Sequence, residues 1–208
     1  MNYIYVVFLA PNTRMGKSIR YFTSNRYSHI AISLNRSITK MYSFARKKYR
    51  LPLSGGFIEE YPIHYFSTSD DIPLKISRVP VSSDIYTRLV STIEDFKSRK
   101  DDMIYNSIDA VTASLLHKPT PIRDCFTCIS FCCHLLGVRN IYTILELEAL
   151  LQDTVIFEGY YMEYVEDFEY KDSSYFESVG IVKIIGSTFS HFGRLFARLI
   201  RQNLAIYI

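Results

Sequence analysis

A cysteine-rich stretch in the second half of the chain combines a candidate nucleophile with the start and end signals of a short helix. It runs from Asp124 to Gly137 and reads DCFTCISFCCHLLG. Asp124 or Thr127 can act as the N-cap, because a side-chain oxygen there accepts a hydrogen bond from a free N–H of the first turn. Gly137 supplies the left-handed residue at which helices commonly end. We therefore expect Cys128 in or beside the first turn, where the helix dipole and free N–H groups favour a thiolate.

A cysteine nucleophile also needs a base, and His29 is the best candidate. A thiol with its ordinary pKa of about 8.5 is mostly protonated at neutral pH, and a neighbouring imidazolium favours the thiolate. The segment 26–34 alternates as a strand, and His29 shares its face with the small residues Ala31 and Ser33. A strand face of small residues is typical where another element or a substrate comes close. The alternatives are a structural histidine and a cysteine that acts as a small buried apolar residue.

Metal and redox chemistry fit the cysteine-rich stretch less well. A structural zinc site needs two separated pairs of ligands, whereas the candidates here share about three turns of one helix. A redox CxxC motif needs a thioredoxin-like strand before it, which residues 119–123 do not supply. Cys125 or Cys132 could still form a disulfide or a resolving pair with Cys128 under oxidation. We expect no metal and no cofactor.

The remaining sequence predicts the elements that must position these residues. Apolar runs predict strands over 2–9, 26–34, 38–45, 57–61, 74–81 and 179–185, and one or two strands over 154–165. Capping residues and helical spacing predict helices over 13–22, 82–98, 106–117, 143–151 and 190–202. The segments 26–34 and 38–45 are close enough to form a hairpin. His29 is therefore expected on a hairpin strand, far before the cysteine helix in the chain.

Composition limits the classes of function. The 208 residues are 48% hydrophobic and 22% charged, which is ordinary for a globular protein. The net charge of +3 is too small to indicate a nucleic-acid partner. No apolar run is long enough to span a bilayer, and the first residues lack the basic region and cleavage site of a signal peptide. Three of the four cysteines lie in or beside one helix, in poor geometry for pairing, so we expect a reduced, cytoplasmic protein.

The order of the two motifs resembles a known family. YSHIA at residues 27–31 and FTCISF at residues 126–131 are similar to the histidine and cysteine motifs of the circularly permuted NlpC/P60-like cysteine hydrolases. In these papain-like proteins the histidine strand precedes the nucleophile helix. MYSF at 41–44, GGF at 55–57 and FEG at 157–159 add to the similarity, which covers roughly residues 1–165. Residues 166–208 form a C-terminal extension, expected to pack on the domain or on a partner chain.

The resemblance implies a permuted papain-like α+β fold, with a mainly antiparallel sheet packed against helices. It implies Cys128 as the nucleophile and His29 as its base. The third polar group of the family, which orients the imidazole, falls at Ser43, where relatives often have a carboxylate. Glu60 is the nearest carboxylate downstream and could take this role. The Cys128 N–H would contribute to an oxyanion hole.

These implications predict a thiol-dependent hydrolase or acyltransferase that acts on an amide or ester bond. Its substrate would be a peptide, a cell-wall peptide or a lipid-like molecule, and nothing in the residues selects among them. The alternative is a catalytically weak or inactive member that serves as a binding or interaction module. A third hypothesis is a peripheral membrane protein that contacts the bilayer through residues 190–202, although such a basic amphipathic helix more often packs on protein. The oligomeric state stays open.

Overall fold

The first strand, β1 (Asn2–Leu9), is buried on both faces, which places it in the interior of the sheet. Val6 and Phe8 belong to one hydrophobic core, and Val7 and Leu9 belong to another. A strand that is buried on both sides reads as a continuous apolar run. The two cores therefore lie on opposite faces of one sheet.

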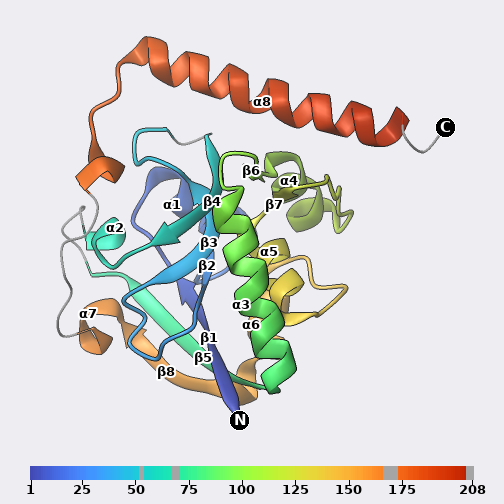
Figure 1. Cartoon of the computed structure of the whole chain (residues 1–208). Helices are drawn as coiled ribbons and strands as arrows, with labels where there is room; N and C mark the ends of the chain where they lie inside the picture. Colours follow the sequence, from blue (N-terminus) through green and yellow to red (C-terminus); the bar gives the residue numbers. More distant parts are fainter. Residues whose placement is uncertain (52–53, 67–70, 166–172, 205–208) are drawn as a thin grey trace.

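A computed structural model of the chain describes residues 1–51, 54–66, 71–165 and 173–204, and its fold is α+β (Figure 1). The main sheet is antiparallel, with six strands in the order β4-β3-β2-β1-β5-β8. The other strands of this sheet are β2 (His29–Ser33), β3 (Met41–Arg46), β4 (Gly55–Glu60), β5 (Pro73–Val81) and β8 (Val155–Tyr160). A small parallel sheet pairs β6 (Ile104–Tyr105) with β7 (Cys125–Phe126).

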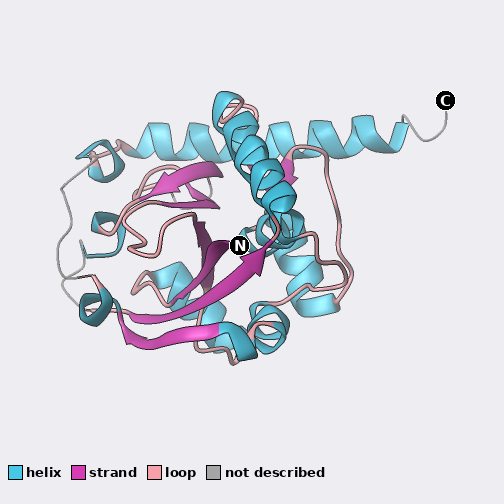
Figure 2. Cartoon of the chain, turned by 60° about the horizontal axis from the view of Figure 1, so that its bottom comes forward, coloured by secondary structure: helices cyan, strands magenta, loops and turns pink. Residues whose placement is uncertain are grey.

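Helices lie on both sides of the strands (Figure 2). They are α1 (Arg14–Thr23), α2 (Ile63–Phe66), α3 (Ser83–Ser98), α4 (Ser107–Leu116), α5 (Cys128–Leu136), α6 (Ile144–Leu150), α7 (Tyr161–Tyr164) and α8 (Ile181–Leu204), with 3-10 turns at Gln152–Thr154 and Ser173–Phe176. The helices α3, α5 and α6 cover the first core, whereas α2 and α7 contribute to the second. No helix in the described part of the chain is long and apolar enough to cross a membrane.

The cysteine helix α5 begins and ends where its capping residues predict. Thr127 is the N-cap, and it forms a capping box in which its side chain and that of Ser130 each accept a backbone N–H of the other residue. Gly137 ends the helix in the left-handed conformation, with φ 69°. Asp124, the other candidate N-cap, lies in the preceding turn. The helix packs across β2 and β3.

Of the two strands predicted near the C-terminus, one is wrong and the other is shorter than predicted. Residues 179–185 are not a strand, because the helix α8 begins at Ile181. The β-branched run in this segment favours a strand locally, but its apolar side chains also continue the helical spacing of the tail. The predicted strand over 154–165 is shorter, because β8 ends at Tyr160 and the next residues form α7.

The described part of the C-terminal extension packs on the preceding residues. Tyr175 is buried, and its carbonyl accepts a hydrogen bond from the N–H of Tyr49. Leu195 of α8 is fully buried beside Ile122 and Cys125. Residues 166–172 and 205–208 lie outside the described residues.

Candidate active site

His29 is the first residue of β2, and its ring contacts a carboxylate that comes from β4. The distance from His29 Nε2 to Glu60 Oε1 is 2.8 Å. Glu60 is buried, with 3% of its side chain exposed, and His29 is largely covered, with 13% of its side chain exposed. Since β3 lies between β2 and β4, the Glu60 side chain reaches the ring across one strand. The contact joins residues that are far apart in the chain and are brought together by the sheet.

The Glu60 carboxylate is held by two hydroxyl groups as well as by His29. The Ser43 hydroxyl donates to Oε1, and the Tyr65 hydroxyl donates to Oε2. Burial alone would raise the pKa of Glu60, but the charge of His29 and the hydrogen bonds from His29 and Ser43 lower it. Glu60 is therefore a buried anion whose two oxygens are both hydrogen-bonded, which is what a buried charge requires.

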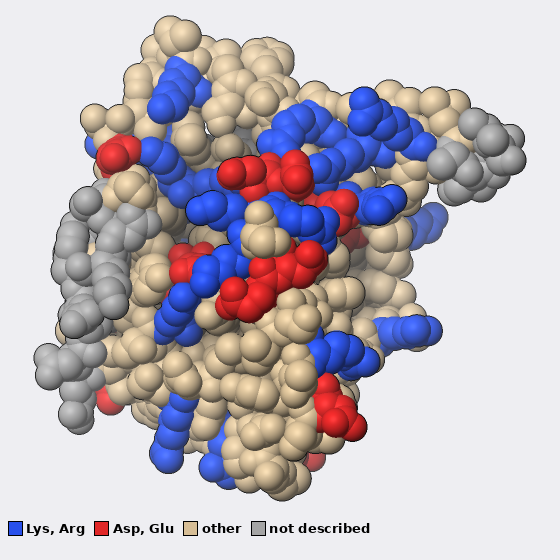
Figure 3. Space-filling view, viewed as in Figure 1, with Lys and Arg blue, Asp and Glu red and all other residues tan. Residues whose placement is uncertain are grey.

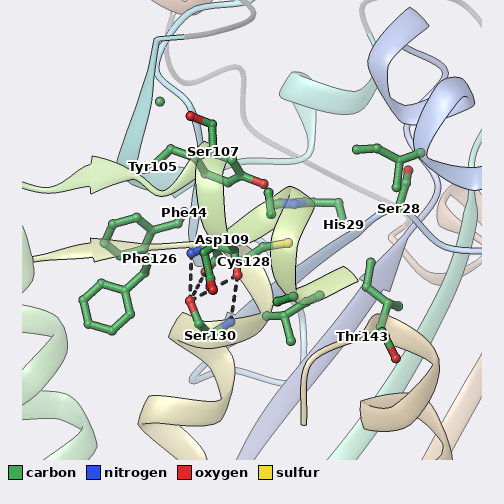
Figure 4. A pocket seen from close by; sticks show the side chains of 18 of the residues that line it. Ser28, His29, Phe44, Tyr105, Ser107, Asp109, Phe126, Cys128, Ser130 and Thr143 are labelled. Carbon is green, nitrogen blue, oxygen red and sulfur yellow. Dashed lines mark hydrogen bonds between the residues drawn. The ribbon is translucent and has the colours of Figure 1, made fainter. Parts of the chain in front are cut away.

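The charge of Glu60 keeps His29 protonated at neutral pH. Burial opposes the imidazolium, but the Glu60 charge and hydrogen bonds with Cys128 and Glu60 together raise the pKa of His29 to about 10. Since Nε2 faces Glu60, Nδ1 is the ring nitrogen that remains for Cys128. In the close view, the sulfur of Cys128 lies beside the His29 ring (Figure 4). The histidine therefore bridges a buried carboxylate and a thiol.

Cys128 is the first residue of α5, so its sulfur lies at the positive end of the helix. The first-turn N–H groups of Ser130 and Phe131 donate to Thr127. Cys128 and Ile129 are the first two residues of α5, so the helix itself supplies no acceptor for their N–H groups. Two free donors next to a nucleophile can stabilise an oxyanion that develops on an attacked carbonyl group.

These residues face a cleft of about 1370 Å³. Its lining includes His29, Cys128 and the hydroxyl-bearing Tyr105, together with apolar side chains from α1, α4, α6 and the loop before α6. Examples of the apolar lining are Phe22, Val111, Ile141 and Leu145. A mostly apolar cleft with a few convergent polar groups is the usual form of a small-molecule site.

Tyr105 adds a neutral hydroxyl group beside the thiol. Burial raises its pKa, and negative charge at Cys128 and Asp109 raises it further. The hydroxyl therefore stays protonated and can donate a hydrogen bond. Tyr105 and Tyr65 were both missed in the sequence, because nothing in the local pattern of either residue separates it from the other tyrosines. Their roles come from tertiary contacts.

The structure brings together three of the residues singled out in the sequence and places Ser43 behind them. Ser43 does not take the predicted place against the imidazole; its hydroxyl group bonds to Glu60, and Glu60 contacts His29. The four cysteines are free thiols, and burial raises the pKa of Cys132 and Cys133, that of Cys133 to about 12. In residues 1–51, 54–66, 71–165 and 173–204, no group of three or more His, Cys, Asp or Glu side chains is arranged to hold a metal ion.

Comparisons with known proteins leave the site to be interpreted from its own geometry. The chain matches no protein-family model, no curated protein and no solved structure.

Proposed function

We propose that the chain is a thiol-dependent hydrolase or acyltransferase that cleaves an amide or ester bond through Cys128 and His29. The observation that carries the proposal is the His29 ring, which is held between the Glu60 carboxylate and the Cys128 thiol. A cysteine at a helix N-terminus beside an imidazolium is the arrangement that activates catalytic thiols.

The reaction would proceed in two steps. The Cys128 sulfur attacks the substrate carbonyl carbon, and the N–H groups of Cys128 and Ile129 stabilise the oxyanion. His29 then donates its proton from Nδ1 to the leaving amine or alcohol, which leaves an acyl-enzyme. In the second step His29 takes a proton from water or from an acyl acceptor, whose oxygen or nitrogen attacks the thioester and releases Cys128.

Glu60 is the positioning residue in this scheme. Its carboxylate orients the ring so that Nδ1 faces the sulfur, and its charge stabilises the imidazolium form. Ser43 and Tyr65 fix the carboxylate in turn. The histidine strand precedes the cysteine helix in the chain, which supports a permuted papain-like arrangement within the α+β fold.

Turnover of simple activated substrates tests this proposal. Purified chain would be assayed with p-nitrophenyl esters of short and medium acyl length and with peptide anilides, next to Cys128→Ala and Cys133→Ala. We expect release of p-nitrophenol or aniline by the wild type and by Cys133→Ala, and loss of about 10³-fold or more in Cys128→Ala. Equal hydrolysis rates in all three proteins would contradict the proposal and favour the alternative, a binding module without catalytic activity.

A further inference from the structure

One face of α8 carries apolar side chains that point away from the rest of the chain. They recur at helical spacing, and each is at least half exposed, from 51% to 81%. We name this set the outer stripe, and it consists of Val182, Ile185, Phe189, Phe196 and Ile200. An exposed apolar row of this length on a folded protein marks a surface that binds another molecule or a membrane.

The opposite face of α8 is fixed to the domain, so the helix cannot rotate to bury the outer stripe. Leu195 is fully buried. Arg198 Nη2 donates to the Asp102 carbonyl at 2.7 Å, and Gln202 Nε2 donates to the Pro121 carbonyl at 3.0 Å. These contacts hold the long arginine and glutamine side chains against backbone carbonyls of the segment 101–125. In Figure 1, α8 lies along one edge of the molecule as a long straight helix.

The charges on α8 favour an anionic partner. Arg198 bonds to the domain, and the other cations of the helix are Lys183, Arg194 and Arg201. The helix contains no aspartate or glutamate. Lysine and arginine side chains gather toward the C-terminal end of the helix in Figure 3. A second copy of the chain that paired stripe to stripe would bring these cations together with no acidic residue of α8 to neutralise them, which disfavours self-association.

We propose that the outer stripe binds the surface of an anionic lipid bilayer, with α8 lying in the plane of the membrane. Aromatic and aliphatic side chains on one face, with cations on the flank, are what an interfacial helix needs in order to enter the headgroup region. The cations attract the negative surface potential of anionic lipids, at about 1 kcal/mol for each Lys or Arg near the surface. The proposal does not depend on the activity of the cleft.

Flotation with lipid vesicles tests the proposal on the full chain. The probes are vesicles of phosphatidylcholine with phosphatidylglycerol, and vesicles of phosphatidylcholine alone. The stripe variant is Val182→Asp with Phe189→Asp, and the matched control is Tyr21→Asp on α1, since Tyr21 is as exposed as the stripe residues, at 81%. Because these side chains are exposed, the variants are expected to keep the fold, which circular dichroism would verify.

We expect the wild type and Tyr21→Asp to float with the anionic vesicles, and the stripe variant to partition at least ~20-fold more weakly. A second variant, Lys183→Gln with Arg201→Gln, removes two charges and should weaken anionic binding roughly 30-fold, with little change on neutral vesicles. Absence of wild-type binding, or equal binding by the stripe variant, would overturn the proposal. So would a concentration-dependent dimer that the stripe substitutions dissociate and that binds no vesicles.

Discussion

The buried carboxylate of Glu60 decides which protonation state His29 holds at neutral pH. Burial favours the neutral imidazole, and only a nearby negative charge reverses this preference. Here the negative charge is that of Glu60, whose Oε1 lies 2.8 Å from His29 Nε2. The other two partners of the carboxylate, Ser43 and Tyr65, are uncharged donors, so they leave its negative charge in place. His29 can therefore stand beside Cys128 as an imidazolium, which is the form that favours a thiolate.

Replacement of Glu60 by glutamine should lower the pKa of His29. The amide keeps the size of the side chain but removes the negative charge, so burial again favours the neutral ring. The imidazole resonances of His29, followed by NMR, should titrate near pH 10 in the wild type and at or below about 6.5 in Glu60→Gln. The control is Glu59→Gln, because Glu59 pairs with Lys40 and Lys97 and does not contact His29. The same titration in both variants would contradict the role of Glu60.

The His29 pKa also predicts how folding stability depends on pH. In the unfolded chain the ring titrates near pH 6.5, whereas in the folded chain its pKa is about 10. The folded state therefore binds the proton more tightly, and the stability that this proton contributes is complete below about pH 6.5 and is lost as pH rises toward 10.

Denaturant unfolding of wild type and His29→Gln between pH 6 and 10 measures this effect. The wild type should lose stability with rising pH more steeply than the variant. The difference between the two proteins isolates His29 from other titrating groups, because those are shared. Parallel curves for the two proteins would show that the imidazolium does not stabilise the fold.

At the scale of elements, the helix N-caps were the most predictable features. Thr13 caps α1, Ser82 caps α3, and Thr127 is one of the two caps proposed for α5. An N-cap depends on only a few consecutive residues, so it can be predicted from the local sequence. The start of α8 was missed because a β-branched run satisfies both the strand and the helix pattern.

Removal of the α5 cap should affect the thiol as well as stability. Thr127→Ala removes the acceptor for the Ser130 N–H and should cost about 1 kcal/mol of unfolding free energy. Because the first turn of α5 also carries Cys128, the reactivity of this cysteine should fall.

Thr143→Ala removes the equivalent capping box from α6 and is the matched control. It should cost a similar free energy and leave the alkylation rate of Cys128 unchanged. Urea unfolding and alkylation kinetics on both variants compare the two effects. An equal loss of Cys128 reactivity in both proteins would indicate general loosening instead of a local effect of the α5 cap.

At the scale of the whole molecule, the site depends on strand order, which the sequence could not give. The motifs around His29 and Cys128 predicted that these residues meet. The carboxylate that contacts the ring comes from β4, across β3, and the hydroxyl that fixes its second oxygen comes from α2. Such contacts depend on which distant segments pair in the sheet. The order of residues within one strand or helix does not reveal that pairing. Ser43 lies at the site, but it contacts Glu60 and not His29, the partner that was predicted for it.

The packing of α8 predicts that the described part of the extension unfolds together with the sheet. Leu195→Ala would leave a cavity beside Ile122 and should cost about 2–5 kcal/mol. Urea unfolding followed by circular dichroism should still show one transition, at lower urea. A separate early transition, or an unchanged midpoint, would mean that α8 is not part of the folding unit.

In the proposed mechanism, Cys128 is an activated thiol because the His29 ring, oriented by Glu60, lies beside it. The most direct measurement is the rate of iodoacetamide labelling at each cysteine from pH 5 to 10, located by peptide mass spectrometry, in wild type and His29→Ala. Cys132 and Cys133 serve as internal references, since burial raises their pKa values.

We predict that Cys128 is labelled selectively well below pH 8 and that this reactivity is lost in His29→Ala. Slow labelling of Cys128 with an ordinary thiol profile, unchanged by the loss of His29, would contradict the account.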